Sequence, residues 1–368
     1  MRLLICAGGT GGGVYPALAV LEQLKGISSN VSSSSLELLW IGGEGGMEEE
    51  LVKRAGVPFQ AIPAAGLHGV GPRALPRNTI TLMRGLKASM KILQEFQPDV
   101  LFFTGGYVAG PMALAGRNIP TLLYVPDIEP GLALKSLARF ADRIAVTASD
   151  SQKYFSEKAI VSGYPLRAEL TAWDKPKARA ALKLDDSLPV LLVFGGSKGA
   201  RSINEAIVPQ LPTLLEMAQV IHISGQLDWA AVQIARTGLT SEQQKRYHTF
   251  PYLHEEMGAA LVSADLVISR AGASTLGEFP CFGLPAILIP YPYAWRYQKV
   301  NADYLAERGA AVIVKDEILK NELLPVVKAL LANPSKLEAM SKAMKSLSHP
   351  QAAQIIAEQI LQLGGQLL

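Results

Sequence analysis

Two glycine-rich segments of the chain contain the residue types that bind phosphate groups. Gly8–Gly13 follows the apolar run RLLICA, and Gly195–Gly199 follows VLLVF. Glycine lets the backbone approach an anion closely, and free N–H groups at the start of a following helix attract negative charge. Neither segment has the spacing G-x-G-x-x-G or G-x-x-x-x-G-K-[ST]. Both segments therefore favour a diphosphate ligand, with a tight turn that binds nothing as the alternative.

Three further groups of residues have the composition of a sugar-nucleotide site. Thr104–Tyr107 reads TGGY, and Ser269–Glu278 reads SRAGASTLGE, each after an apolar run. A carboxylate such as Glu278 can accept hydrogen bonds from both hydroxyls of a ribose. Gln298 and Asn301 are spaced i, i+3, which places their amides on one face of a helix, where they could bind sugar hydroxyls. For these three side chains, a solvated helix surface is the alternative.

These segments need parallel strands to bring them together. Short apolar runs alternate with longer amphipathic stretches, and several runs are continuously apolar, as in strands that are covered on both faces. Strands are predicted at 2–7, 36–41, 100–104, 120–125, 143–146, 190–194, 219–224, 266–269 and 286–290. This pattern predicts an α/β fold with parallel sheets. Ligands bind at the carboxyl ends of such strands, so we expect the glycine turns to face a common cleft.

The length and a coarse repeat predict two domains. A chain of 368 residues exceeds the roughly 250–300 residues of a single core. RLLICAGGTGGG near the N-terminus resembles VLLVFGGSKGARS from residue 190, and each would open its own sheet. Gly and Pro in VSGYPLR mark the junction. We expect domains at 1–163 and 164–350, with a last helix at about 351–368 that packs back on the first domain.

Composition excludes several classes of protein. The chain is 49% hydrophobic and 18% charged, with a net charge of +3 and only two cysteines, Cys6 and Cys281, which we expect to be buried thiols. No His/Cys cluster has zinc-site spacing, so no metal or other cofactor is expected. The apolar run at the N-terminus is too short for a signal peptide, and no run approaches the ~18 residues of a membrane span. We expect the chain to stay in the cytoplasm, without a nucleic-acid partner.

One basic segment indicates an anionic surface as partner. Residues 51–94 contain no Asp or Glu but include Lys53, Arg54, Arg73, Arg77, Arg84, Lys87 and Lys91. An amphipathic helix is predicted at 79–94. Its apolar stripe comprises Met83, Leu86, Met90 and Leu93, with Arg84, Lys87 and Lys91 alongside. We expect residues 73–94 to dock on an anionic membrane, and a core-facing helix with a basic outer side is the alternative.

The motifs, in their order along the chain, resemble the MurG family of glycosyltransferases. They are AGGTGG at 7–12, TGGYVAGP at 104–111, PGL at 130–132, GYPLR at 163–167, GGSKGARSIN at 195–204, RAGASTLGE at 270–278, GLPAILIP at 283–290 and Q-x-x-N-A at 298–302. The resemblance implies a GT-B fold of two Rossmann-like domains. It also implies transfer of N-acetylglucosamine from UDP-GlcNAc to an undecaprenyl-diphosphate-linked muramyl-pentapeptide, at the cytoplasmic side of the membrane.

The resemblance also implies site residues. The UDP-sugar belongs to the C-terminal domain, where Arg167 and Ser197 would hold the diphosphate, the backbone at Leu253 and His254 would meet the uracil, and Glu278 would bind the ribose. Gly272, Ala273, Ser274, Thr275, Leu276 and Gly277 would lie along the phosphates, Gln298 and Asn301 would bind the sugar hydroxyls, and Thr10, Gly11 and Gly12 would close over donor and acceptor.

Two departures from the family pattern bear on the catalytic base. Gly13 stands where the family usually has His, and Tyr124–Asp127 reads YVPD where it usually has HEQN. Asp127 or Glu129 is therefore the expected general base. These departures leave open a GT-B transferase for another lipid. Because a shared fold does not fix the function, a UDP-GlcNAc 2-epimerase and an inactive nucleotide-sugar-binding protein are further alternatives.

Overall fold

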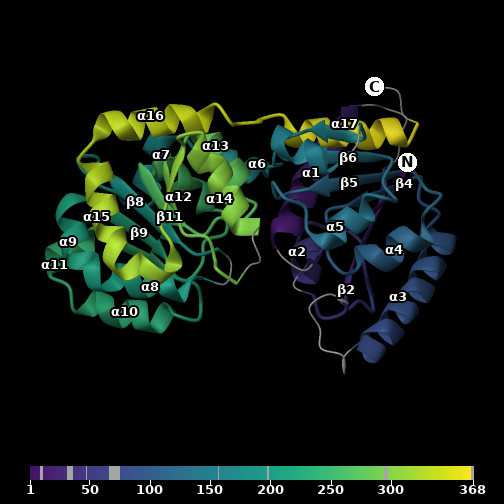
Figure 1. The fold of residues 1–368 in the computed structure, drawn as a ribbon, viewed down its shortest axis with the longest axis horizontal. Helices are drawn as coiled ribbons and strands as arrows, with labels where there is room; N and C mark the ends of the chain where they lie inside the picture. Colours follow the sequence, from purple (N-terminus) through teal and green to yellow (C-terminus); the bar gives the residue numbers. More distant parts are fainter. Residues whose placement is uncertain are drawn as a thin grey trace. The chain divides into compact units, whose positions relative to one another are not determined.

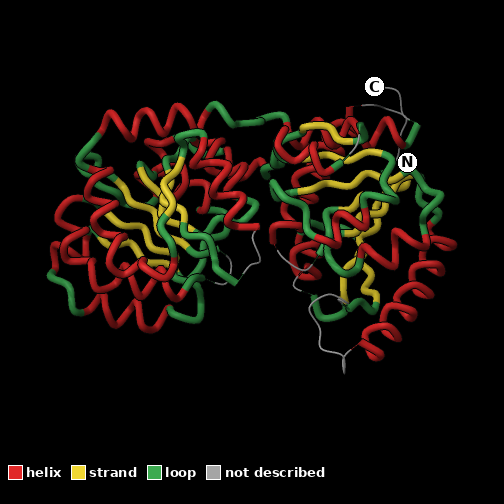
Figure 2. The backbone as a smooth tube through the Cα atoms, viewed as in Figure 1, coloured by secondary structure: helices red, strands yellow, loops and turns green. Residues whose placement is uncertain are grey.

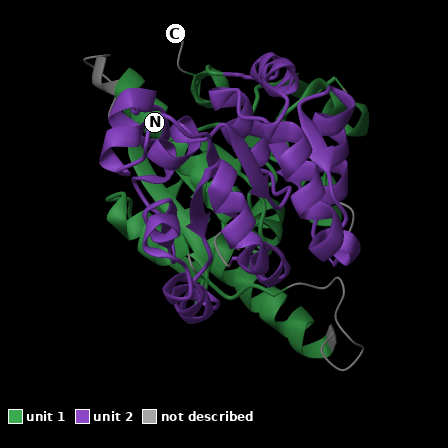
Figure 3. Ribbon diagram, turned by 90° about the vertical axis from the view of Figure 1, so that its left-hand side faces the viewer, with its two compact units in different colours: residues 1–167, 350–368 green, residues 168–349 purple. Residues whose placement is uncertain are grey.

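The chain forms two compact units. The computed structural model describes residues 1–8, 11–30, 36–46, 48–65, 75–155, 157–196, 199–293 and 297–365. Unit 1 comprises Met1–Arg167 and Pro350–Leu368, and unit 2 comprises Ala168–His349 (Figures 1 and 3). The sequence predicts the first junction after residue 163, whereas the structure assigns residues 164–167 to unit 1 as well. In each unit, helices surround the strands (Figure 2).

Unit 1 contains a seven-stranded parallel sheet in the order β3-β2-β1-β4-β5-β6-β7. Its strands are β1 (Arg2–Cys6), β2 (Glu37–Gly43), β3 (Phe59–Ile62), β4 (Val100–Phe103), β5 (Thr121–Val125), β6 (Arg143–Val146) and β7 (Ala159–Val161). The order reverses between β1 and β4, which places the ends of these two strands at a topological switch point.

The helices of unit 1 include one from the far end of the chain. They are α1 (Gly11–Asn30), α2 (Glu48–Arg54), α3 (Leu75–Phe96), α4 (Ala109–Ala115), α5 (Leu132–Leu137), the 3₁₀ helix η1 (Ser149–Tyr154) and α17 (Ala352–Leu363). Helix α17 packs beside α1 and over β4 and β5. It buries Ile356, Ile360 and Leu361 there, and Arg143 of β6 donates to the side chain of Gln362 at 2.6 Å.

Unit 2 contains a six-stranded parallel sheet in the order β10-β9-β8-β11-β12-β13. Its strands are β8 (Val190–Phe194), β9 (Gln219–Ile223), β10 (Tyr247–Phe250), β11 (Leu266–Ser269), β12 (Ala286–Leu288) and β13 (Ala311–Ile313). The order reverses between β8 and β11, as it does between β1 and β4 in unit 1. The two parallel sheets confirm the predicted α/β fold.

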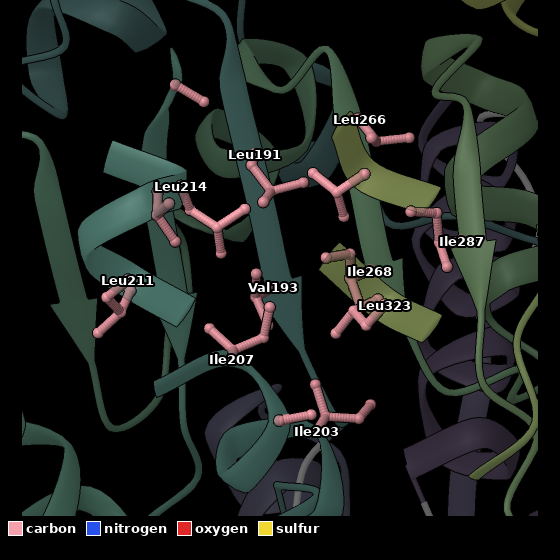
Figure 4. Packing of buried hydrophobic residues seen from close by; sticks show 14 of the residues in the cluster. Leu191, Val193, Ile203, Ile207, Leu211, Leu214, Leu266, Ile268, Ile287 and Leu323 are labelled. Atoms are coloured by element: carbon pink, nitrogen blue, oxygen red, sulfur yellow. The ribbon is translucent and has the colours of Figure 1, made fainter. Parts of the chain in front are cut away.

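The helices of unit 2 cover a continuous apolar core. They are α6 (Ala168–Thr171), α7 (Lys175–Ala181), α8 (Arg201–Ile207), η2 (Val208–Gln210), α9 (Leu211–Met217), α10 (Trp229–Thr237), α11 (Ser241–Lys245), α12 (Met257–Ser263), α13 (Thr275–Phe282), α14 (Tyr297–Glu307), η3 (Asp316–Ile318), α15 (Leu319–Leu331) and α16 (Pro334–Lys345). In this core, Val193 of β8 and Ile268 of β11 pack with Ile203 and Ile207 of α8 and Leu323 of α15 (Figure 4).

Candidate substrate-binding sites of the two units

The glycine turn at Gly8–Gly13, called here the first glycine turn, and the turn at Thr104–Tyr107 lie together in unit 1. They follow β1 and β4, the two strands at the switch point of this sheet. Thr104 Oγ1 donates to Gly13 O at 2.7 Å, and a Cβ at Gly106, whose φ is +90°, would lie 3.0 Å from Gly8 O. Gly11 and Gly12 form the start of α1, while Thr10 lies outside the described residues. The backbones of the two turns are therefore close to each other.

A buried carboxylate supports the first glycine turn. Glu48, the first residue of α2, is almost completely buried, and its Oε1 accepts from Gly43 N at 2.9 Å. The same Oε1 lies 2.4 Å from the position that a Cβ at Gly8 would take, so any larger residue there would displace the Glu48 carboxylate. Burial raises the pKa of the Cys6 thiol, and the negative charge of Glu48 raises it further. Nothing in the sequence distinguishes Glu48, because an acid at the start of a helix is usually solvated.

The two predicted base candidates follow β5 and differ in accessibility. Asp127 is half-buried, whereas Glu129 is buried and its Oε1 lies 3.7 Å from Lys135 Nζ. The segment is held by Thr147, whose Oγ1 donates to Pro126 O at 2.8 Å. Burial raises the pKa of Tyr124, the charge of Asp127 adds to this increase, and the hydrogen bond to Thr147 opposes it. Of the two carboxylates, Asp127 is the more accessible to solvent.

Arg167 is the last residue of unit 1 before the chain enters unit 2. Its guanidinium carbon lies 4.2 Å from the ring centroid of Tyr15, a cation–π contact with helix α1. Arg167 therefore lies beside the helix that follows the first glycine turn. Ser197, the other residue that is expected to hold the diphosphate, lies outside the described residues.

In unit 2, the turn after β11 leads into α13 and brings Glu278 close to it. Thr275 Oγ1 donates to Gly272 O at 2.7 Å, which shapes the turn, and Ser274 Oγ donates to Glu278 Oε2 at 3.1 Å. Ala273 and Ser274 are half-buried, whereas Leu276 and Gly277 pack into the core. The polar residues of the segment thus share one end of the helix, and the carboxylate of Glu278 is half-buried beside them.

Gln298 and Asn301 share α14 but differ in their surroundings. Gln298 is half-buried, and its Oε1 accepts from Tyr291 N at 2.9 Å. Asn301 is completely buried, and its Nδ2 donates to Ala271 O at 3.2 Å. In this structure the Asn301 amide therefore supports the turn after β11, whereas Gln298 is at the surface of the unit.

The expected uracil contacts follow β10, at the edge of the sheet of unit 2. Leu253 is buried and His254 is exposed. The rings of Tyr252 and His254 pack edge to face, with their centroids 4.6 Å apart. Because all six strands are parallel, this segment lies at the carboxyl-terminal edge of the sheet, as do the glycine turn after β8 and the turn after β11.

An arginine connects several of the loops on this side of unit 2. Arg270 is buried, and its two terminal nitrogens donate to Asp316 Oδ1 at 2.5 Å, Ser202 Oγ at 2.8 Å and Ile289 O at 3.1 Å. Ser202 also donates to Asp316 Oδ1, at 2.7 Å. The contacts fix the start of α8 to the loops after β11, β12 and β13. The motif RAGASTLGE includes Arg270, but its partners are too distant in sequence to be predicted.

Helix α3 has a solvent-facing side that is both apolar and basic. Ile80, Met83 and Met90 are 54%, 66% and 59% exposed. Arg77, Arg84, Lys87 and Lys91 are exposed as well. The opposite side packs inward through Gly85 and Ser89, because a Cβ at Gly85 would lie 2.3 Å from Pro63 O. Met83 and Met90 of the predicted stripe are thus exposed, whereas Leu86 and Leu93 are half-buried. No helix in the described ranges is long and apolar enough to cross a bilayer.

The described residues contain no group of three or more His, Cys, Asp or Glu side chains that could hold a metal ion.

Protein-family models match both halves of the chain. Residues 3–146 match the glycosyltransferase family 28 N-terminal domain, and residues 190–356 match the C-terminal domain of the same family. The crystal structure of Acinetobacter baumannii MurG is similar, with a TM-score of 0.75, 26% identity, and coverage of 98% of this chain and 99% of that one. A UDP-GlcNAc 2-epimerase from Neisseria meningitidis has a TM-score of 0.68 at 14% identity, covering 98% of this chain and 100% of that one, and shares the fold alone.

Relatives with named activities are similar over almost the entire chain. A protein of Desulforudis audaxviator is 42% identical over 99% of both chains, and one of Roseiflexus is 41% identical over 97% of this chain and 94% of its own. Both are named UDP-N-acetylglucosamine--N-acetylmuramyl-(pentapeptide) pyrophosphoryl-undecaprenol N-acetylglucosamine transferase. At this level of identity and coverage, the chain belongs to the MurG family of GT-B glycosyltransferases.

Proposed function

We propose that the chain transfers N-acetylglucosamine from UDP-GlcNAc to an N-acetylmuramyl-(pentapeptide) that is linked through a diphosphate to undecaprenol, a step of peptidoglycan synthesis. The observation that carries this proposal is the identity of about 40% to relatives with that name over almost the full length of both chains. The proposal is also supported by the family motifs of the sequence, which include the glycine turns, Glu278 and Gln298.

Unit 2 is the proposed donor site. The turn that follows β8, with Ser197, and the turn from Gly272 to Gly277 would bind the diphosphate, and Arg167, the residue directly before this unit begins, would add a positive charge. Glu278 would accept the ribose hydroxyls and Gln298 would bind the hydroxyls of the amino sugar. Asn301, which is buried, would act through the turn that it holds. The backbone at Leu253 and His254 would bind the uracil.

Unit 1 is the proposed acceptor site, with Thr10, Gly11 and Gly12 close to the reacting groups. The acceptor hydroxyl oxygen would attack the anomeric carbon while the bond from that carbon to the diphosphate oxygen breaks, which inverts the configuration and releases UDP. A carboxylate takes the hydroxyl proton in such a step. Asp127 is half-buried and Glu129 is buried against Lys135, so Asp127 is the proposed base.

The exposed side of α3 is the proposed membrane contact. A polyprenyl acceptor stays in the bilayer, so the enzyme must reach the cytoplasmic membrane surface as a peripheral protein. Met83, Met90 and Ile80 would enter the interface while the neighbouring Arg and Lys side chains contact anionic headgroups. This combination of large exposed apolar side chains and cations on one helix supports the docking proposal more directly than a basic surface alone.

Transfer of labelled N-acetylglucosamine from UDP-GlcNAc to the lipid-linked muramyl-pentapeptide tests the function. We expect a radiolabelled lipid product that is absent without enzyme. Parallel reactions contain another polyprenyl-diphosphate sugar as acceptor, or UDP-GlcNAc alone. Transfer only to the other lipid would identify a different transferase, conversion of UDP-GlcNAc to its 2-epimer would identify an epimerase, and UDP-GlcNAc binding without any reaction would identify a binding protein.

A further inference from the structure

A buried histidine that has no part in the proposed reaction lies near the glycine turn of unit 2. His222 is completely buried in β9, the strand beside β8. Its Nδ1 lies 2.7 Å from the Tyr247 hydroxyl on β10, and its Nε2 lies 2.9 Å from Asn204 Oδ1. Asn204 belongs to α8, the helix that follows the glycine turn. Through these contacts the histidine connects β9 and β10 to α8.

The partners of Asn204 determine which nitrogen of His222 carries the proton. Asn204 Nδ2 donates to Ser224 O at 2.9 Å and to Asp228 Oδ2 at 2.8 Å. Carbonyl and carboxylate oxygens accept hydrogen bonds, so the amide nitrogen must face them and Oδ1 must face the histidine. Oδ1 is also an acceptor, so Nε2 of His222 is the protonated nitrogen. Its Nδ1 then accepts from the hydroxyl of Tyr247.

The charge state of the ring agrees with this assignment. Burial lowers the pKa of His222 to about 4, and the negative charge of Asp228 acts in the opposite direction. The imidazole is therefore neutral at physiological pH, with one donor and one acceptor nitrogen, and each has a suitable partner.

The two groups that Asn204 holds reach the end of the glycine turn and the start of α8. Gly199 has a φ of +75°, and a Cβ there would lie 2.4 Å from Ser224 O, so the end of the turn packs directly on this carbonyl. Asp228 Oδ1 accepts from Arg201 Nε at 3.2 Å, and Arg201 is the first residue of α8. The loop between β9 and α10 thus supports the turn from one side, and Asn204 fixes that loop.

We propose that His222, as the Nε2–H tautomer, is a positioning residue for diphosphate binding in unit 2. Its proton fixes the orientation of the Asn204 amide. That amide fixes Ser224 and Asp228, and these two support Gly199 at the end of the turn and Arg201 at the start of α8, beside the backbone that would receive the diphosphate. The inference rests on the proposed donor site. Its physical basis is preorganisation, because backbone whose flanking residues are already held in place loses less entropy on binding.

Calorimetric titration with UDP measures this role. His222→Leu removes both polar contacts, whereas His222→Gln keeps a side-chain N–H that can face Asn204. We expect His222→Leu to weaken UDP binding by about tenfold or more, as for loss of a hydrogen-bonded support, and His222→Gln to recover most of the loss. Leu261→Ala, on α12 of the same unit, is the control, because Leu261 is completely buried and α12 packs mainly on α6 and α7. It lowers the melting temperature at a distance from α8, so UDP affinity should stay near that of the wild type.

Two results would overturn the inference. One is UDP binding by His222→Leu equal to that of the wild type, which would leave the histidine with a structural role only. The other comes from the wild-type chain alone and does not depend on any variant folding. Long-range ¹H–¹⁵N spectra should show His222 as the Nε2–H tautomer from pH 6 to 8, and an Nδ1–H tautomer or an imidazolium would contradict the network. A wild-type chain that bound no UDP would instead contradict the proposed function itself.

Discussion

At the scale of single residues, Glu278 and Gln298 separate the two halves of the proposed donor. Glu278→Ala should weaken UDP and UDP-GlcNAc by the same factor, about 10- to 100-fold, because the ribose is common to both and a charged hydrogen-bond acceptor is lost. Gln298→Ala should weaken UDP-GlcNAc and leave UDP unchanged. Calorimetry on both ligands measures this, with Glu242→Ala on α11 as an exposed control. Wild-type affinities in both variants would show that the site is elsewhere.

The assignment of Asp127 as base has its own kinetic test. Asp127→Asn keeps the size of the side chain and removes the proton acceptor, so kcat with the lipid acceptor should fall by about 10²-fold or more. Glu129→Gln is the comparison, and a larger loss in that variant would transfer the role to Glu129. Gly13→His should retain activity within about tenfold of the wild type, because the proposed base lies elsewhere in the chain. The new Cβ would lie 3.3 Å from Thr104 Oγ1, so the Thr104 side chain has to shift slightly.

The contacts between distant residues explain which parts of the site the sequence could predict. Glycine turns, Glu278 and Gln298 are visible as short patterns, because the chemistry is in the residue types and their spacing. His222 appears in the sequence only as a polar residue in the apolar run QVIHI, and its partners Asn204 and Tyr247 come from other elements. Arg270 is in a motif, yet its ion-pair partner Asp316 is 46 residues away. Such partners become known only when the sheet order is known.

At the scale of elements, helix α3 offers a test of membrane docking. Binding of the Arg84/Lys87/Lys91→Glu variant to vesicles that contain anionic lipid should fall at least about 100-fold, because each cation near the surface contributes about 1 kcal/mol. Wild-type binding should decrease at high salt and without anionic lipid. The control is Lys320/Lys336/Lys342→Glu, which makes the same charge change on α15 and α16 of unit 2.

Co-sedimentation with vesicles distinguishes two causes of weaker membrane binding: loss of the α3 docking surface and a change in the net charge of the protein. If both triple variants lose binding equally, the effect is one of net charge and α3 is not the docking surface. Replacing Met83 and Met90 with Ser should weaken the binding that persists at high salt, since these exposed side chains contribute apolar area rather than charge.

The strands show where sequence patterns lose their information. The nine strands predicted from apolar runs all occur, with ends that differ by at most a few residues. The four strands that were not predicted, β3, β7, β10 and β13, are the edge strands of the two sheets. Phe59–Ile62 and Tyr247–Phe250 read FQAI and YHTF, with largely half-buried or exposed positions. An edge strand has fewer neighbours to cover it, so it lacks the continuous apolar run that marks a central strand.

At the scale of the whole molecule, substitutions in the two cores test whether each unit has a stability of its own. Ile360→Ala on α17 removes a side chain that is completely buried in unit 1, and Leu323→Ala does the same in the core of unit 2. Each should lower the free energy of unfolding of its own unit by about 2–5 kcal/mol. Hydrogen exchange resolved by residue separates the two effects. Faster exchange of β4 and β5 in Ile360→Ala, without a change in β8 and β11, is the expected result, and uniform acceleration would contradict the division.

The path of α17 has a consequence for the order in which the chain matures during synthesis. Unit 2 is one continuous segment, so all of its residues have been made once His349 has been added. The sheet of unit 1 precedes unit 2 in the chain, yet its covering helix, Ala352–Leu363, is translated after all of unit 2. Until those residues leave the ribosome, the apolar surface that Ile356, Ile360 and Leu361 later cover stays open to water. The unit whose synthesis starts first is therefore completed after the other, and a chain that stops between His349 and Ala352 would contain all of unit 2 but lack the covering helix of unit 1.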